Sequence, residues 1–385
     1  MPADRDHALA YAPAPATSSF CRVIPRAAIG LAHTRAPSAA KPYCDAVIRA
    51  FGPGRVNLIG EHTDYNGGLA LPFAIDRGVT VEAEPLAGGE IRAEALDLGE
   101  SDSFAAAAPQ PADGWRAFVR GTVAELRAAG FDIGGTRLAF SGDAPQGSGL
   151  SSSAALEAAL CLALLAVAGA EEPDRTELAE LCSRVENDWV GAETGLLDQL
   201  ASLQCSAGAA LRIDFATLEL RPVPLDLGDW RLVTLESGAQ HRNAESGYNE
   251  RRAECRAACA ALGVEHLAAA DPEAADRLPE PLRRRARHVL SEDERVDAMV
   301  AALHSGDLAA AGLLLDASHA SLRDDYEASV AEVEATVVAL MQAGAAGARM
   351  VGGGFGGSVL ALLPPGVEPP SGSVAVTPGA PARLL

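Results

Sequence analysis

Pro145-Gln-Gly-Ser-Gly-Leu-Ser-Ser-Ser-Ala154 decides the fold, because this stretch joins a short apolar strand to a long apolar helix. We expect the strand over residues 136–141, and we expect Ser151 or Ser152 to cap a helix that ends near Ala168. The first turn of a helix leaves backbone N–H groups unpaired and carries about half a positive charge from the aligned peptide dipoles. Two glycines let the backbone approach an anion closely, so the stretch predicts a phosphate site at a helix start. The simpler alternative is a glycine-rich linker that only caps the helix.

The chain must hold phosphate without a catalytic lysine. Lys41 is its only lysine, and the other 30 side chains in the Lys and Arg total are arginines. A Walker A loop, a protein-kinase site and a pyridoxal phosphate enzyme each need a lysine, which excludes these three chemistries. A second glycine cluster, residues 352–357, precedes another apolar segment. Two such clusters indicate one nucleotide pocket assembled from both halves of the chain.

Composition indicates a protein that binds small ligands. The formal net charge is −21, which argues against nucleic acid and anionic membranes as partners, because both reward clustered cations. No run of about 18 apolar residues predicts a membrane span, and the N-terminus lacks the apolar segment of a secretory signal. The seven cysteines are scattered without metal-binding spacing, which favours a reducing cytosol. We expect a cytoplasmic protein and take it to be a monomer.

The order of predicted elements indicates an α+β fold. Periodicity predicts helices over residues 115–129, 174–189, 248–262 and 330–343, a further helix opening near Gly195, and strands over 211–215, 232–236, 358–363 and 373–376. Residues 89–111 are expected to form one strand followed by a loop. Helices and strands alternate irregularly, which favours two α+β domains over a βαβ repeat. Residues 1–42, rich in Ala, Pro and Ser, are expected to be a poorly ordered extension.

A second motif, Gly54-Arg-Val-Asn-Leu-Ile-Gly-Glu-His-Thr-Asp-Tyr-Asn-Gly-Gly68, concentrates short polar side chains. Glu61, His62 and Asp64 follow one apolar pair, and each carboxylate can accept hydrogen bonds from two hydroxyl groups. The motif therefore predicts recognition of a polyol. A metal site and a polar surface turn are the alternatives, although one histidine with two carboxylates does not match a zinc spacing.

These motifs resemble those of a known family. Residues 54–66 resemble the galactokinase signature, and residues 147–154 and 352–357 resemble the second and third motifs of the GHMP small-molecule kinases, to which galactokinases belong. The resemblance covers about residues 52–363. It implies a ribosomal-protein-S5-like N-terminal domain over 43–205, a ferredoxin-like C-terminal domain over 206–385, and an active site in the cleft between them. It also implies transfer of the γ-phosphoryl group of ATP to the anomeric hydroxyl of galactose, with Mg²⁺ bound.

The resemblance assigns roles residue by residue. Asp198 would be the catalytic base, and Arg55 would pair with it and stabilise charge on the γ-phosphoryl group. The galactose ligands would be Glu61, His62, Thr63, Asp64, Gly195 and Tyr248. The ATP ligands would be Gly147, Ser148, Gly149, Leu150, Ser151, Ser152, Ser153 and Trp115, and the Mg²⁺ ligands would be Ser153 and Glu186. One hydroxyl and one carboxylate, completed by phosphate and water, suit Mg²⁺ well.

Two rival functions stay open. The first is a kinase of a related sugar, such as N-acetylgalactosamine, galacturonate or arabinose, although Glu61 and Asp64 would repel the carboxylate of galacturonate. The second is a sugar- and ATP-sensing regulator that kept the fold and lost catalysis. That function predicts a substitution at Arg55, at Asp198 or within the glycine- and serine-rich residues 147–153, and the sequence has none.

Overall fold

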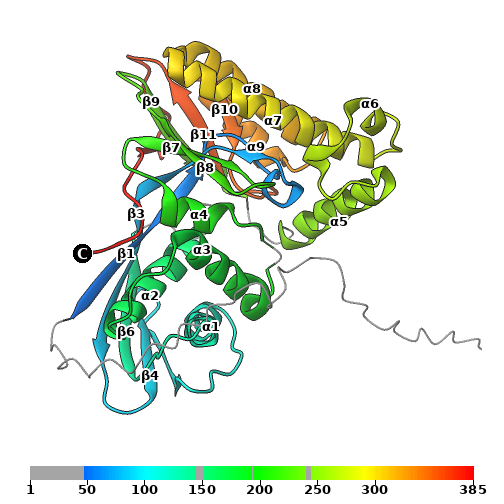
Figure 1. Ribbon diagram of the computed structural model, residues 1–385. Coiled ribbons are helices and arrows are strands. Elements are labelled where there is room, and N and C mark those ends of the chain that lie inside the picture. The colour runs from blue at the N-terminus through cyan, green and yellow to red at the C-terminus, as the bar shows by residue number, and fades with distance from the viewer. Residues whose placement is uncertain (1–46, 144–150, 193, 240–243) are drawn as a thin grey trace, which may run out of the picture. The chain divides into compact units, whose positions relative to one another are not determined.

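Six strands form the first sheet of the computed structural model (Figure 1). The structure describes residues 47–143, 151–192, 194–239 and 244–385, so the predicted extension 1–42 lies outside it. In hydrogen-bonding order the strands are β13 (Arg383–Leu384), β1 (Ile48–Asn57), β3 (Pro72–Pro85), β6 (Thr136–Gly142), β4 (Glu90–Ala95) and β5 (Glu100–Ala105). The pair β4–β6 is parallel and the other neighbours are antiparallel. The register of β1 against β3 shifts between Pro53 and Arg55, and such a bulge re-aims the side chain that follows it.

Four helices and a π-helical turn pack beside this sheet (Figure 1). They are α1 (Trp115–Ala128), α2 (Ser152–Val167), α3 (Arg175–Arg184), the π-helical turn η2 (Val185–Val190) and α4 (Leu197–Gln204). Residues 154–165 of α2 are all buried, as expected for a helix that is apolar on every side. A Cβ at Gly52 would lie 1.9 Å from the carbonyl oxygen of Ala155, so β1 can approach α2 this closely only through a glycine. This contact fixes the start of α2 beside the middle of β1.

The second half of the chain forms a four-stranded antiparallel sheet with helices around it (Figure 1). Its strands, in order, are β10 (Gly347–Met350), β11 (Ser358–Leu363), β9 (Arg231–Glu236) and β12 (Val374–Val376). The helices are α5 (Ala244–Leu262), α6 (Pro272–Ala275), α7 (Leu282–Ser305), α8 (Leu308–Asp324) and α9 (Ala331–Gln342), with a 3₁₀ turn η3 (Leu267–Ala269). Every residue of β11 is buried, so both faces of this strand are covered.

A small sheet and a shared core tie the two halves together. The strands β2 (Leu69–Ala70), β7 (Ala209–Asp214) and β8 (Glu219–Pro224) form a three-stranded sheet, and the 3₁₀ turn η1 (Asp64–Asn66) comes just before β2. One core cluster contains Val56 and Phe73 from the first sheet together with Leu315 and Leu360 from the second half. Residues of β13 also return to pair with β1. The proposed boundary between residues 205 and 206 stays a prediction.

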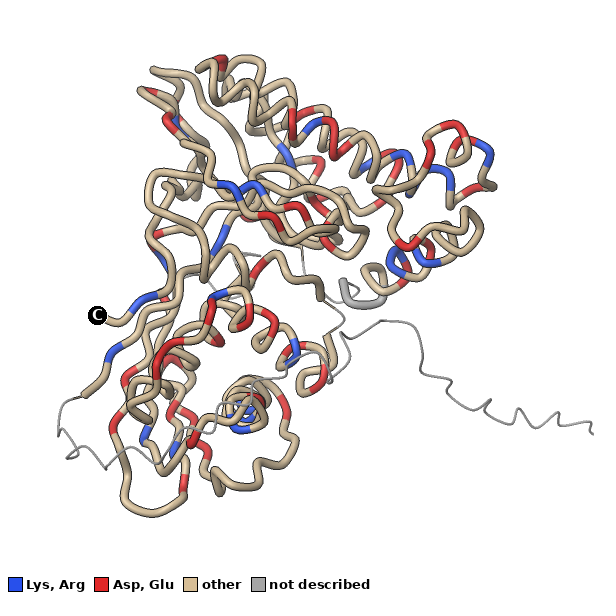
Figure 2. The backbone as a smooth tube through the Cα atoms, viewed as in Figure 1, with Lys and Arg blue, Asp and Glu red and all other residues tan. Residues whose placement is uncertain are grey.

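Basic and acidic residues are interspersed over the described backbone (Figure 2). At the start of α7, Arg283 pairs with Glu280, and Arg284 pairs with Glu280 and Glu327. Among the described residues, no helix is both long and apolar enough to cross a bilayer.

Most of the predicted elements are present, and two predictions need correction. Residues 89–111 do not form one strand and a loop: they contain the hairpin β4–β5, whose alternation is carried largely by alanine and is therefore weak. The helix predicted over 174–189 ends as the α-helix α3 at Arg184 and continues as η2. π-Helical turns of this kind often occur at functional sites.

Candidate active site

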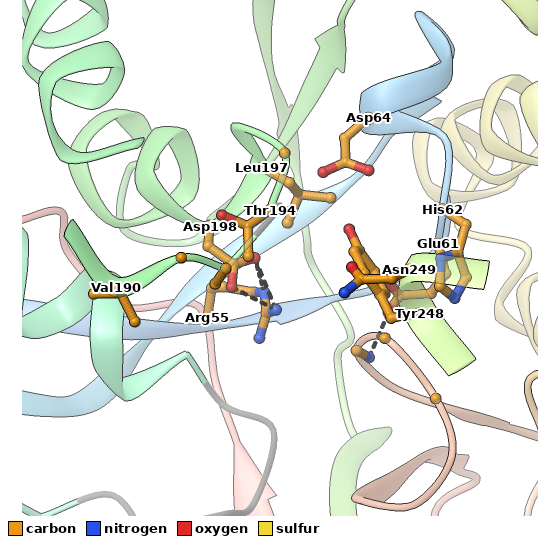
Figure 3. Close-up of a pocket in the computed structure, with 16 residues that line it drawn as sticks. Arg55, Glu61, His62, Asp64, Val190, Thr194, Leu197, Asp198, Tyr248 and Asn249 are labelled. Carbon is orange, nitrogen blue, oxygen red and sulfur yellow. Dashed lines mark hydrogen bonds and ion pairs between the residues drawn. The ribbon is translucent and has the colours of Figure 1, made fainter. Parts of the chain in front are cut away.

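A cavity of about 390 Å³ opens where segments far apart in the sequence meet (Figure 3). β1 and the turn after it supply one wall, the segment from η2 to α4 a second, and α5 with the glycine cluster a third. Its lining residues are Arg55, Glu61, His62, Asp64, Val190, Gly191, Ala192, Thr194, Gly195, Leu197, Asp198, Tyr248, Asn249, Gly352, Gly353 and Gly354. The cavity therefore receives residues from both halves of the chain. It also brings together all the predicted catalytic and sugar-binding residues except Thr63.

Arg55 and Asp198 form a two-pronged ion pair on the cavity wall (Figure 3). Arg55 Nε donates to Asp198 Oδ1 at 2.8 Å, and Nη2 donates to Oδ2 at 2.8 Å. Such fork-to-fork pairs fix orientation as well as charge. Arg55 is 7% exposed, while the side chain of Asp198 is 28% exposed and can meet a ligand.

Ser151 contacts Asp198 and does not cap the helix. It occupies the N-cap position of α2 with φ of 60°, and its side chain makes no capping hydrogen bond. Its Oγ donates to Asp198 Oδ2 at 2.7 Å instead. Ser151 therefore holds the predicted N-cap position, but the capping hydrogen bond expected of its side chain is absent, because the hydroxyl donates to the aspartate.

Glu61 is held by groups from the second half of the chain. Arg349 Nη2 lies 2.9 Å from Glu61 Oε1, and the backbone N–H of Gly352 donates to the same oxygen at 2.8 Å. Arg349 is fully buried and also donates to the carbonyl oxygen of Leu58 at 2.8 Å. The imidazole of His288 lies 3.0 Å from the Glu61 carbonyl oxygen. Sequence reasoning missed Arg349 and His288, because a lone arginine on a short strand and a lone histidine on a helix have no distinguishing pattern.

His62, Asp64 and Tyr248 project toward the cavity (Figure 3). Burial, assisted by His288 and by the charges of Arg349 and Arg251, lowers the pKa of His62 well below its usual range, so its imidazole is neutral. Burial raises the pKa of Asp64 to about 6. Gly195 leaves room for Asp64, because a Cβ at Gly195 would lie 1.7 Å from Asp64 Oδ2.

The turn that carries these side chains is stabilised internally. Thr63 Oγ1 lies 2.9 Å from the carbonyl oxygen of Gly60 and 2.7 Å from that of Leu69, and its single hydrogen donates to one of them or is shared between both. Asn66 Nδ2 donates to the carbonyl oxygen of His62 at 2.7 Å, and His62 has a φ of 62°. Thr63, expected among the sugar ligands, therefore has its hydroxyl engaged by backbone, and it stabilises the strained turn.

A second cavity of about 360 Å³ lies at the start of α2. Trp115, Ser152 and Ser153 line it, and the indole of Trp115 packs edge-on against Phe140 at 5.4 Å between ring centroids. The segment Gly147, Ser148, Gly149 and Leu150 lies outside the described residues. Of the predicted nucleotide residues that the structure describes, Trp115, Ser152 and Ser153 thus line one cavity, and Ser151 contacts Asp198 instead.

Glu186 is a buried carboxylate that hydrogen-bonds to Ser153. Its Oε2 accepts from Thr194 Oγ1 at 2.6 Å and from Gln199 Nε2 at 2.9 Å. Burial raises the pKa of Glu186, and it raises the pKa of fully buried Glu157 well above the usual range, with the charge of Glu186 adding to that shift. Thr194, Gln199 and Glu157 were not predicted as site residues, because their types are common at helix starts and on helix faces.

Comparison with known proteins identifies the class. The family model of the galactokinase galactose-binding signature matches residues 41–85, and the models of the GHMP kinase N-terminal and C-terminal domains match 117–206 and 299–371. The mevalonate kinase of Methanococcus jannaschii has the same fold, with a TM-score of 0.62 and 19% identity over 84% of this chain and 92% of that one. The fold and the paired cavities thus define a two-domain α+β kinase of the GHMP superfamily.

Closer relatives narrow the class to one family. The galactokinase of Mycobacterium tuberculosis is 45% identical over 320 residues, which cover 81% of this chain and 88% of the relative. The galactokinase of Streptomyces coelicolor is 43% identical over 327 residues, covering 81% and 83%. The crystal structure of Lactococcus lactis galactokinase complexed with galactose superposes with a TM-score of 0.82 and 34% identity, covering 88% of this chain and 95% of that one. The chain belongs to the galactokinase family and is an ATP-dependent sugar kinase.

Proposed function

We propose that the 390 Å³ cavity binds galactose and that Asp198 accepts the proton of the anomeric hydroxyl while the γ-phosphoryl group of ATP is transferred to it. The observation that carries this assignment is the Arg55–Asp198 pair, which stands in a cavity that Glu61, His62, Asp64 and Tyr248 also line. Galactokinase activity rests on family membership; the roles of the residues are the proposal.

The sugar side of the cavity suits a neutral polyol. Glu61 and Asp64 supply carboxylate acceptors, and His62 and Tyr248 supply further polar atoms beside them. The Lactococcus lactis relative is described in complex with galactose, which supports galactose as the sugar bound here. Gly195 contributes by leaving room for Asp64, because a Cβ added at this position would lie 1.7 Å from Asp64 Oδ2.

ATP would occupy the second cavity with its phosphates at the start of α2. Trp115 would cover the base, and Gly147, Ser148, Gly149, Leu150, Ser151, Ser152 and Ser153 would surround the phosphates. This orientation directs the terminal phosphate toward Asp198, because Ser151 at the helix start already contacts that aspartate at 2.7 Å. The backbone N–H groups of the first turn would bind the phosphate oxygens, as a lysine does in Walker-type sites.

The oxygens around Glu186 fit a magnesium ion. Ser153 and Glu186 are in contact and offer one hydroxyl and one carboxylate, an oxygen-only set of the kind that binds Mg²⁺ together with phosphates and water. Among the residues that the structure describes, no group of three or more His, Cys, Asp or Glu is arranged to hold a metal by itself. When bound, the ion neutralises charge on the β- and γ-phosphates.

The identity of the sugar is tested by a substrate panel. Galactose, N-acetylgalactosamine, galacturonate and arabinose are each offered with ATP and Mg²⁺, ADP release is followed by a coupled assay, and the product is identified by phosphorus NMR. Galactose should give the highest kcat/KM and a phosphate on the anomeric oxygen. Faster turnover of another sugar would make that sugar the assigned substrate in place of galactose. Binding of galactose and ATP without turnover would indicate the sensing function. A monomeric state and a cytoplasmic location stay predictions, for sizing chromatography and cell fractionation to check.

A further inference from the structure

The two ring nitrogens of His62 have different surroundings. Nδ1 lies 2.8 Å from the hydroxyl of Tyr65, whereas Nε2 is buried and has no hydrogen-bond partner within the described part of the protein. His62 lines the sugar cavity (Figure 3). A neutral imidazole has one donor nitrogen and one acceptor nitrogen, and the partner of one nitrogen decides what the other can do. The role of Nε2 toward a ligand is therefore set by the proton on Tyr65.

Tyr65 is the first member of a row of hydrogen-bonding groups that leads away from the cavity. Its hydroxyl lies 2.7 Å from the hydroxyl of Tyr326, which lies 3.2 Å from Cys255 Sγ. The amide of Asn66 donates to Cys255 Sγ at 3.6 Å. Tyr326 also stacks on the His62 ring at 4.4 Å between centroids and is fully buried. The row runs from α5 and the end of α8 to the turn that carries the sugar-binding residues.

Protons can be arranged along this row in two ways. In the first, the Cys255 thiol donates to Tyr326, Tyr326 donates to Tyr65, and Tyr65 donates to His62 Nδ1. Every hydrogen between Cys255 and His62 Nδ1 then has an acceptor, and His62 carries its own proton on Nε2, where only a bound ligand can accept it. In the reverse arrangement, the Cys255 sulfur accepts from both Tyr326 and Asn66, and no acceptor for its thiol hydrogen is found among the described residues. The reverse arrangement therefore leaves two buried groups unpaired, the thiol hydrogen and the lone pair of Nε2, whereas the first leaves only the Nε2–H hydrogen, which a ligand in the cavity can accept. Because buried polar groups are normally paired, the first arrangement is favoured.

The first arrangement also complements the rest of the cavity. Glu61, Asp64 and Asp198 can only accept hydrogen bonds when they are ionised. A sugar hydroxyl that donates its proton to one of these carboxylates has lone pairs left over, and an Nε2–H donor can use one of them. A group that offers only donors, such as the ammonium of an amino sugar, would meet the Nε2–H hydrogen without an acceptor.

We propose that Tyr65 and Tyr326 are positioning residues that fix the Nε2–H tautomer of His62, so that this N–H donates to a hydroxyl oxygen of the bound sugar and selects hydroxyl over ammonium or hydrogen at that carbon. The proposal rests on the sugar-binding role of the cavity. Burial supports it by keeping the imidazole neutral, since a doubly protonated ring would have no tautomer to fix.

The direct test is nitrogen NMR of histidine-labelled protein, with His62 assigned from a His62→Gln spectrum. We expect Nε2 of His62 to carry the proton both without ligand and with galactose bound, and Nδ1 to carry it in neither. A proton on Nδ1 in the wild-type protein would overturn the proposal, whatever the variants do. This readout is independent of turnover, so a protein with the Nε2–H tautomer that fails to phosphorylate galactose would refute the proposed function and leave the inference standing.

The kinetic test uses Tyr65→Phe and Tyr326→Phe, which keep the rings and remove the hydroxyls. The control is Cys259→Ala, one helical turn after Cys255 on α5. Each Phe variant should raise the KM for galactose by roughly three- to tenfold, the scale of one neutral hydrogen bond, with kcat changed by less than about twofold. The increase should vanish for one monodeoxygalactose, the one that lacks the hydroxyl facing His62. A purely structural role predicts instead an equal loss with every deoxy sugar, and that result would overturn the proposal.

Discussion

Replacing Gly195 by alanine should weaken sugar binding without harming the fold. An alanine Cβ would lie 1.7 Å from Asp64 Oδ2 and 2.4 Å from its Cγ, whereas ordinary van der Waals contact begins at 3.4 Å. Oδ2 must therefore retreat by about 1.7 Å, the difference between 3.4 and 1.7. Hydrogen bonds span only about 2.7–3.2 Å, so the displaced carboxylate loses its sugar hydroxyl. A hydrogen bond to a charged group contributes about 1.5–3 kcal/mol, which corresponds to a rise in KM of roughly ten- to hundredfold.

The assay compares Gly195→Ala with the wild-type protein at saturating ATP over a galactose titration. The KM for galactose should rise while kcat, the KM for ATP and the melting temperature change little, because the clash is with the end of a side chain. Gly89→Ala is the matched control, since a Cβ at Gly89 meets nothing within 4 Å. An unchanged KM for galactose in Gly195→Ala would refute the placement of Asp64 against the sugar.

Three further outcomes follow from the buried charges. Because burial raises the pKa of Asp64 to about 6, the kcat/KM for galactose should rise with pH through about 6 as the carboxylate ionises, and Asp64→Asn should abolish this limb of the pH–rate profile. Burial raises the pKa of Glu157 above its ordinary 4.5, so the native state keeps a proton that the unfolded state loses, and stability falls as pH rises above 4.5. The free energy of unfolding of Glu157→Gln, measured relative to the wild-type protein in denaturant titrations, should thus rise by up to about 1.4 kcal/mol per pH unit between pH 5 and 7. A fall in this difference with pH would mean that Glu157 is ionised. Arg349→Met should lower the free energy of unfolding by about 3–5 kcal/mol, because it leaves the Glu61 carboxylate without its buried partner. An unchanged free energy of unfolding at pH 7 would show that the backbone N–H of Gly352 alone satisfies Glu61.

The parts of the fold with strong local patterns could be predicted from the sequence. The helix α2 is apolar on every side, and β11 is a continuous apolar run after glycines, so both were expected within a residue or two of their bounds. The hairpin β4–β5 was missed because two of the three buried residues of β4 are alanines, Ala93 and Ala95, which give little contrast with their polar neighbours. The long helix α7 was not predicted, since two of its core positions are Arg285 and Glu292, which are buried through ion pairs.

The candidate site was predictable where motifs concentrate function and not where contacts cross the chain. The turn after β1 holds adjacent polar residues, so Glu61, His62 and Asp64 could be chosen together. Arg349 lies 288 residues after Glu61 in the sequence, and only the folded chain places their charged groups 2.9 Å apart. The contact of Ser151 with Asp198 was likewise hidden, because it depends on a left-handed backbone angle at a serine.

The measurement that tests the central claim most directly is the turnover of Asp198→Asn, with Asp188→Asn, an exposed carboxylate on η2, as the control. Asparagine keeps the shape of Asp198 and cannot accept the hydroxyl proton as a base. We predict that ATP and galactose still bind with near wild-type affinity by calorimetry and that kcat falls by at least about 10²-fold, the scale of a lost general base. Wild-type turnover in Asp198→Asn would contradict the assignment and remove Asp198 from the mechanism.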